Sequence, residues 1–276
     1  MSPALFHPRS LLRLFATALC ACLLPASLQA QAPLQGRDLM NSTDPRVEHR
    51  SYRFENTGEN LPYAVFVSSK VDRSVPAPLI VNLHGLGVGP GFMLRGKLLD
   101  LAEEQGYIVV GPIGYSVGGW YGTPVIAMNN QPVEPANLSE LSEQDVLDVL
   151  AMIRDEFQVD PKRTYLLGHS MGGAGTLYLG AKHAANWAAI AAIAPAAFRL
   201  EPPATLDAVK DTLPILVVTG DADTLVSPDT VRRWRDYMAA NVKTQQYTEY
   251  AGADHGSIID LAMDEIFTWF AAHPKP

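Results

Sequence analysis

Ser170 lies at the centre of a Gly-x-Ser-x-Gly motif that it forms with Gly168 and Gly172. An apolar run at residues 164–167 precedes the motif and a segment of mostly small residues at 174–185 follows it, so the pattern predicts a buried strand that turns sharply into a helix. Such a turn strains its central residue and leaves no room for side chains at the flanking positions. We therefore expect Ser170 to stand at the carboxyl end of the strand and to act as a nucleophile.

A serine hydroxyl becomes an effective nucleophile when a neutral imidazole, oriented by a carboxylate, removes its proton. His255 is the candidate base because it lies in a short glycine-flanked loop, residues 251–257, between the last expected strand and the last expected helix. We expect His84 and His169 to be buried and to have structural roles. The other histidines fall in the leader, an early strand, a helix and the tail: His7, His49, His183 and His273.

The candidate acid follows the apolar run at residues 214–220, in a loop that carries both Asp221 and Asp223. We assign the acid to Asp223 because it lies further past the strand end, where its side chain can turn back towards the imidazole. Asp221 is expected to cap or stabilise the turn. The chain order of the candidates is then Ser170, Asp223, His255, an order typical of hydrolases with this type of strand-to-helix turn.

Acyl transfer also needs N–H donors for the negative charge that develops on the carbonyl oxygen. We expect one donor to be the backbone of Met171, at the start of the helix after Ser170. The second is expected from the glycine-rich loop at residues 84–89, where the main chain of Leu86 is our choice and that of Gly85 the alternative.

Short apolar runs alternate with helical patterns along the rest of the chain. The runs lie at residues 79–83, 107–113, 164–167, 188–193 and 215–219, and the helical patterns at 95–104, 140–157, 171–185, 229–240 and 258–271. Residues 245–250 are expected to add one more strand. A hairpin at residues 47–54 and 61–68 opens the sheet. The alternation predicts an α/β fold with a mostly parallel sheet covered by helices on both faces. Because ligands bind at the carboxyl ends of such strands, the candidate residues are expected to meet there.

The first 30 residues are typical of a secretory signal, because Arg9 and Arg13 precede an apolar run that ends in small residues. We expect cleavage after Ala30, with Ala32 as an alternative, and a secreted or periplasmic protein. Both cysteines, Cys20 and Cys22, lie inside this segment, so the exported chain would have no disulfide. Lipidation at one of them is the less favoured interpretation.

Composition limits the partners of the chain. The formal net charge is −8, and loss of the signal would make the protein more acidic, which argues against nucleic acid as a partner. After the signal, no stretch reaches the roughly 18 to 20 apolar residues that a membrane span needs. We expect residues 31–276 to form one catalytic domain that needs no cofactor or metal, and we leave its oligomeric state open.

At these residues the chain resembles the α/β-hydrolase family over nearly all of the sequence after the signal. The resemblance rests on Leu83-His84-Gly85, residues 159–163, residues 168–173 and residues 193–195. These segments look like those of secreted esterases of the polyhydroxybutyrate-depolymerase and feruloyl-esterase type, and equally like the catalytic domains of prolyl-oligopeptidase-like peptidases. The resemblance implies an α/β-hydrolase fold with Ser170 as nucleophile, Asp223 as acid and His255 as base.

The favoured interpretation is an exported serine hydrolase that cleaves carboxylic esters, small or polymeric, through an acyl-enzyme intermediate. A prolyl-oligopeptidase-like peptidase is the alternative enzyme, and a catalytically silent binding protein is the alternative from another class. Only about 20 residues, 195–214, separate two strands where many hydrolases insert a lid, so we expect one short helix and an open site. Trp120 and Tyr121, with Met171, are expected to form an apolar shelf for the substrate.

Overall fold

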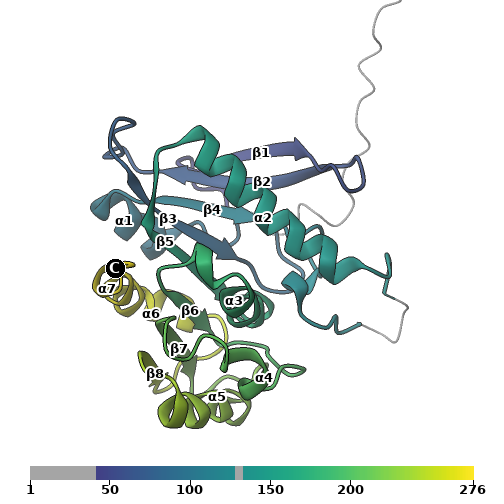
Figure 1. Ribbon diagram of the computed structural model, residues 1–276, viewed down its shortest axis with the longest axis vertical. Coiled ribbons are helices and arrows are strands. Elements are labelled where there is room, and N and C mark those ends of the chain that lie inside the picture. The colour runs from purple at the N-terminus through teal and green to yellow at the C-terminus, as the bar shows by residue number, and fades with distance from the viewer. Residues whose placement is uncertain (1–41, 128–132) are drawn as a thin grey trace, which may run out of the picture. The chain divides into compact units, whose positions relative to one another are not determined.

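The computed structural model describes residues 42–127 and 133–276. Its centre is an eight-stranded sheet with the order β1-β2-β4-β3-β5-β6-β7-β8 (Figure 1). The strands are β1 (Glu48–Arg53), β2 (Asn60–Val67), β3 (Ala77–Leu83), β4 (Ile108–Pro112), β5 (Val159–His169), β6 (Ile190–Ile193), β7 (Ile215–Gly220) and β8 (Gln245–Tyr250). β1 and β2 pair antiparallel, as do β2 and β4, and every other pair is parallel. The expected α/β fold with a mostly parallel sheet is confirmed.

Four of the central strands are mostly apolar and fully buried. Every residue of β3, β4, β6 and β7 is buried, which is the pattern of a parallel sheet covered on both faces. β1 instead alternates exposed and half-buried residues, because it is an edge strand with a single neighbour. The expected opening hairpin is confirmed by the register that runs from Glu48 opposite Val65 to Arg53 opposite Asn60.

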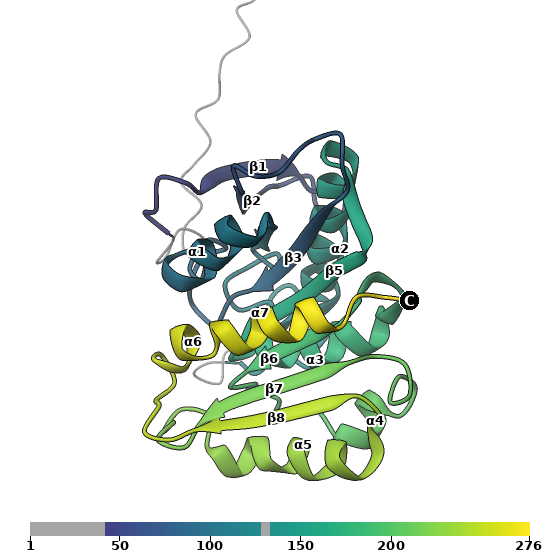
Figure 2. The ribbon, with the colours of Figure 1, turned by 90° about the vertical axis from the view of Figure 1, so that its left-hand side faces the viewer.

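Helices cover the two faces of the sheet in separate layers. α1 (Gly96–Gln105), α6 (Ile258–Leu261) and α7 (Met263–Ala272) pack on one face, which is turned towards the viewer in Figure 2. The other face carries α2 (Leu138–Glu156), α3 (Met171–Lys182), α4 (Pro202–Leu206) and α5 (Pro228–Asn241). The described residues also form the short 3₁₀ turns η1 (Trp120–Gly122) and η3 (Ala184–Asn186).

The observed elements differ from the expected ones at two places. β5 begins at Val159 rather than at residue 164, because its polar first half continues the pairing with β3 at Ala77. The apolar stretch at 258–271 is not one helix but two, α6 and α7, which meet at Ala262. Between β6 and β7 the structure has one short helix, α4, as expected, and no large lid.

The fold brings the candidate residues to one edge of the sheet. Ser170 directly follows β5, Asp223 follows β7, and His255 follows β8. The loop with Gly85 and Leu86 follows β3, which is the neighbour of β5. These strands are parallel, so all four carboxyl ends lie at the same edge.

Two expectations concern the N-terminus and the membrane. The expected signal, with its boundary after Ala30, lies outside the described residues and stays a prediction. Within residues 42–127 and 133–276, no helix is long and apolar enough to cross a bilayer.

Candidate active site

Ser170 occupies the sharp turn between β5 and α3. Its backbone has φ 58° and ψ −116°, a conformation that costs a non-glycine residue free energy. A Cβ atom at Gly172 would collide with the carbonyl oxygen of Leu83, and one at Gly168 would collide with that of Gly172. The two glycines of the motif therefore let the turn pack directly against β3, and Ser170 remains partly exposed.

Backbone hydrogen bonds hold this strained residue in place. The N–H of Ser170 donates to Ile193 O at 2.9 Å, and its carbonyl oxygen accepts from Ala174 N at 3.0 Å and Ala196 N at 2.9 Å. The partners belong to β6, α3 and the loop after β6, so three separate segments fix the position of the serine.

Asp223 and His255 are hydrogen-bonded to each other. The distance between His255 Nδ1 and Asp223 Oδ2 is 2.6 Å, and the Asp223 side chain has no exposed surface. The other carboxylate oxygen, Oδ1, accepts from Leu225 N at 2.8 Å and Val226 N at 2.9 Å. A carboxylate held in this way accepts a hydrogen bond from Nδ1–H, which fixes the tautomer and leaves the lone pair of His255 Nε2 available as a base.

Asp221, the competing acid, has a different environment. Its Oδ1 accepts from the backbone N–H of Gly252 at 2.6 Å, and the residue is exposed. The side chain thus ties the loop after β7 to the loop after β8, which agrees with the turn-stabilising role expected for it.

His169 connects Ser170 with the His255 loop. Its Nε2 donates to His255 O at 2.8 Å, and the two imidazole rings lie 4.5 Å apart between centroids. Burial, and then the nearby His255, lower the pKa of His169 to about 3, so this ring is neutral and has one proton to donate. Because His169 precedes Ser170 directly, this bond brings the base to the serine turn; its burial was expected, but this partner, far away in the sequence, was not.

The loop after β3 approaches Ser170 through a glycine. A Cβ atom at Gly85 would lie 3.6 Å from Ser170 Cβ. The fully buried His84 has Nδ1 2.7 Å from Gly85 O and Nε2 3.0 Å from Ile113 O, and burial lowers its pKa. A neutral ring donates at one nitrogen only, and the contact with Gly85 is the shorter.

This contact bears on the candidate oxyanion donors. Gly85 O and the N–H of Leu86 belong to one trans peptide and point in opposite directions, so a bond from His84 to Gly85 O turns the Leu86 N–H away from the histidine. Met171, the other candidate donor, is the first residue of α3 and directly follows Ser170. Binding of an oxyanion by Met171 and Leu86 stays a prediction.

Trp120 and Tyr121, which were expected to form an apolar shelf for the substrate, are buried. They lie in η1 with only 4% and 0% of their surface exposed, and Met171 is buried as well. The Tyr121 ring packs edge-on against His84 at 5.6 Å, and a Cβ atom at Gly175 of α3 would come within 2.6 Å of Tyr121 Cβ. The small residue on α3 lets the ring enter the core, so these aromatics provide no exposed shelf, and their contact with substrate stays a prediction that burial disfavours.

Three other apolar side chains are exposed in the loops of the site. Leu86 follows Gly85, Phe198 lies two residues after Ala196, and Leu225 lies two residues after Asp223. Their exposed fractions are 37%, 45% and 71%. We call these three residues the apolar rim. No periodicity could have marked them, because they lie in loops, where exposed and buried apolar residues look alike in a sequence.

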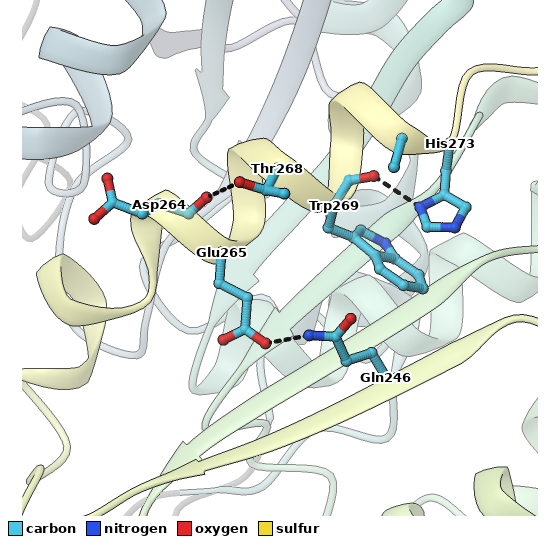
Figure 3. A pocket seen from close by; sticks show the side chains of 7 residues that line it. Gln246, Asp264, Glu265, Thr268, Trp269 and His273 are labelled. Atoms are coloured by element: carbon cyan, nitrogen blue, oxygen red, sulfur yellow. Dashed lines mark hydrogen bonds between the residues drawn. The ribbon is translucent and has the colours of Figure 1, made fainter.

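A hollow of about 400 Å³ lies elsewhere, between β8 and α7 (Figure 3). In it Glu265 accepts a hydrogen bond from Gln246 at 2.5 Å, and the Trp269 ring lies beside His273. Gln246 is near the start of β8, whereas His255 follows the end of that strand, so this hollow is separate from the candidate site. No group of three or more His, Cys, Asp or Glu side chains among the described residues is placed to hold a metal ion.

The comparisons with known proteins agree with this geometry. A family model described as "Putative esterase" matches residues 55–258, which include Ser170, Asp223 and His255. The chain belongs to this esterase family. Among curated proteins, the S-formylglutathione hydrolase of Rattus norvegicus is 27% identical over 146 residues, covering 49% of this chain and 51% of that enzyme.

Solved structures show the same fold at low sequence identity. An S-formylglutathione hydrolase from Agrobacterium tumefaciens superposes with a TM-score of 0.64 at 21% identity, covering 83% of this chain and 95% of that one. A ferulic acid esterase from Anaeromyces mucronatus gives 0.63 at 16% identity, covering 88% and 96%. The α/β-hydrolase fold of the esterase family member is thereby confirmed.

The alignments with curated relatives are partial. They span 51% of the rat enzyme and 40% and 15% of two other curated esterases, one of them the bifunctional acetylxylan esterase/xylanase XynS20E of Neocallimastix patriciarum. This esterase family member thus spans about half or less of the length of the curated relatives that it matches.

Proposed function

We propose that this protein is an exported serine esterase that hydrolyses carboxylic esters through Ser170, His255 and Asp223. The observation that carries the proposal is the 2.6 Å hydrogen bond between His255 and the buried Asp223 carboxylate, at the sheet edge where Ser170 occupies a strained turn. His169 supports it further, because it joins the serine turn to the backbone of the base. Membership of the esterase family agrees with this chemistry.

The proposed reaction has two halves. In the first, Ser170 Oγ attacks the ester carbonyl carbon while His255 Nε2 takes its proton, and the backbone N–H groups of Met171 and Leu86 bind the oxyanion. The carbon–oxygen bond of the ester then breaks, and the alcohol leaves with the proton from His255. In the second half, His255 takes a proton from water while the water oxygen attacks the acyl carbon. The bond between the acyl carbon and Ser170 Oγ then breaks, Oγ takes the proton back from His255, and the carboxylic acid leaves.

The substrate side of the proposal is an ester with an apolar acyl or alcohol group. The apolar rim of Leu86, Phe198 and Leu225 is exposed in the loops that follow β3, β6 and β7, and apolar surface there favours a substrate that covers it. The single short helix between β6 and β7 leaves this region without a large lid, which suits a substrate too large to be enclosed. Relatives named for acetylxylan, S-formylglutathione and ferulic acid share ester or thioester cleavage.

Export is part of the proposal and rests on the sequence of residues 1–30. Expression of the full chain in a bacterial host, followed by separation of the periplasm and medium from the cytoplasm, tests it. The N-terminal residue of the exported protein should be Gln31. A protein retained in the cytoplasm with Met1 intact would contradict export and leave the esterase assignment untouched.

Hydrolysis tests the chemistry. The purified wild-type protein should hydrolyse p-nitrophenyl esters, and the Ser170→Ala variant should not. The two proteins should have the same circular dichroism spectrum. Feruloyl esters, a polyester film and an aminopeptidase substrate complete the panel. Cleavage of the aminopeptidase substrate alone would favour a peptidase, and no turnover on any substrate would favour a binding protein.

A further inference from the structure

Two polar side chains of α2 lie against the backbone of the loop at residues 114–122. Asp145 is fully buried, and its Oδ2 accepts from Gly114 N at 2.6 Å and from Tyr115 N at 3.3 Å. Its other oxygen, Oδ1, accepts from the hydroxyl of Tyr52 at 2.6 Å. One turn earlier on the helix, Ser142 Oγ accepts from Tyr121 N at 2.9 Å. The helix therefore holds the loop at both ends.

The loop needs such support because its backbone is strained. Tyr115, Trp120 and Tyr121 have φ values of 61°, 62° and 49°, in the left-handed region that side chains disfavour. Residues keep this conformation only where surrounding contacts fix it. Close packing adds to the hydrogen bonds, since a Cβ atom at Gly114 would lie 2.9 Å from Ser142 Oγ.

The same loop contacts the segment that carries the candidate oxyanion donor. Val117 O accepts from Gly87 N at 2.8 Å, and a Cβ atom at Gly118 would lie 3.4 Å from Leu86 Cδ1. Leu86 is thus fixed on both sides, through Gly85 O by His84 and through Gly87 N by Val117. The second of these contacts depends on the position of the loop that Asp145 holds.

We propose that Asp145 is a positioning residue for ester hydrolysis, which acts through the loop at 114–122 to keep the main chain of Leu86 directed at the oxyanion. It is no catalytic residue, because its contacts are with Gly114, Tyr115 and Tyr52 and not with the reacting groups. The inference rests on the proposed function, since it gives a role to the Leu86 N–H.

The charge of Asp145 adds a pH dependence to this role. Burial raises the pKa of Asp145 to about 6. The groups that face it are Tyr52 of β1, Tyr121 of η1 and Asp148 of its own helix, and burial raises the pKa of both tyrosines, so they stay neutral near pH 6. A neutral carboxyl group accepts hydrogen bonds more weakly than a carboxylate, so the loop should loosen as pH falls below about 6.

Asp145→Asn is the test variant, with Asp148→Asn as its matched control one turn along α2. Asp148 accepts a hydrogen bond from Gln144 of the same helix. Its charge also raises the pKa of Asp145, so the two variants are compared at pH 8, where Asp145 is ionised with or without Asp148. On p-nitrophenyl acetate at pH 8, we expect Asp145→Asn to lower kcat about tenfold or more, within the roughly 10²–10³ that loss of a whole oxyanion donor costs. KM should not rise. The melting temperature should not fall, because the variant removes a charge that burial disfavours. Asp148→Asn should match the wild type.

The pH profile separates positioning from simple packing. In the wild type, log kcat should fall more steeply below pH 6 than in Asp145→Asn, because Asp145 takes up a proton in this range and the asparagine cannot. Tyr52→Phe, which removes only the donor to Oδ1, should lower kcat by a smaller factor and provides the test if Asp145→Asn fails to fold.

Two results would overturn the proposal. The first is a folded Asp145→Asn protein with the wild-type kcat. The second is an Asp145→Asn protein whose kcat falls only in proportion to its loss of folded protein, together with a Tyr52→Phe protein that has the wild-type kcat and pH profile. Ser170→Ala is measured beside these variants. If the wild type is active and Ser170→Ala is not, the esterase assignment stands and either result refutes the role of Asp145 alone. If the wild type hydrolyses no ester, the proposed function itself fails.

Discussion

Asp223 and Asp145 are two buried aspartates with nearly the same hydrogen-bond pattern. Each accepts hydrogen bonds from the backbone N–H groups of two consecutive loop residues and one further hydrogen bond from a side chain. They differ in the third partner, which is the imidazole of His255 for Asp223 and the phenol of Tyr52 for Asp145. An imidazole can take up a second proton near neutral pH, whereas a buried tyrosine stays neutral.

The difference shows what makes a buried carboxylate part of the chemistry. In the proposed mechanism Asp223 stabilises an imidazolium that forms during the reaction, so its charge has a direct use. Asp145 has no cationic partner among its contacts, and burial raises its pKa, so its charge is a cost to the folded state. In our account the protein keeps this destabilising carboxylate because it fixes a strained loop.

The comparison predicts a large asymmetry between the acids of the site. Asp223→Asn should lower kcat by about 10⁴, because the imidazole loses its orienting partner. Asp221→Asn, two residues away in the same loop, should lower kcat far less, since the Asp221 carboxylate accepts from the backbone N–H of Gly252 and the His255 imidazole is bonded to Asp223. Steady-state kinetics on one p-nitrophenyl ester measure both, and a reversed order would assign the acid to Asp221.

The cost assigned to Asp145 can be measured as a change of stability with pH. The pKa of Asp145 is raised from 3.8 to about 6 in the folded state, so the folded state binds this proton more tightly than the unfolded state does. The contribution of Asp145 to the free energy of unfolding is therefore full below pH 4 and is lost as pH rises through 6. The loss amounts to about 3 kcal/mol at most. Asp145→Asn should therefore gain stability relative to the wild type between pH 4.5 and pH 7.5 in urea unfolding. A difference between the two proteins that stays constant over this range would show that the charge carries no such cost.

Apolar side chains near the two aspartates differ in their exposure to solvent. Leu225 beside Asp223 is 71% exposed, whereas Tyr121 near Asp145 is fully buried. We expect Phe198→Ala and Leu225→Ala to raise KM for long-chain or aryl esters by up to about tenfold, from the loss of buried apolar area, and to leave acetyl esters unchanged. Val75→Ala, an exposed apolar residue before β3, is the control. Equal effects on acetyl and long-chain esters would argue against substrate binding by the rim.

The sequence allowed the sheet, the serine turn and the loop positions of Asp223 and His255 to be predicted, because periodicity and glycine spacing report local geometry. Asp145 could not be found in this way. It lies on an amphipathic helix among other acids, where a carboxylate is normally solvated, and its partners Gly114 and Tyr52 are distant in the sequence. The burial of Trp120 and Tyr121 was missed for a related reason: it depends on how Gly114 and Gly175 let the loop pack between α2 and α3.

Covalent labelling tests the central claim most directly. The wild-type protein treated with an alkyl fluorophosphonate should gain one phosphonyl group on the peptide that contains Ser170, as detected by mass spectrometry, and lose its esterase activity in parallel. Folded Ser170→Ala should gain none. An adduct at another residue, or labelling of Ser170→Ala to the wild-type extent, would contradict the assignment of Ser170 as the nucleophile.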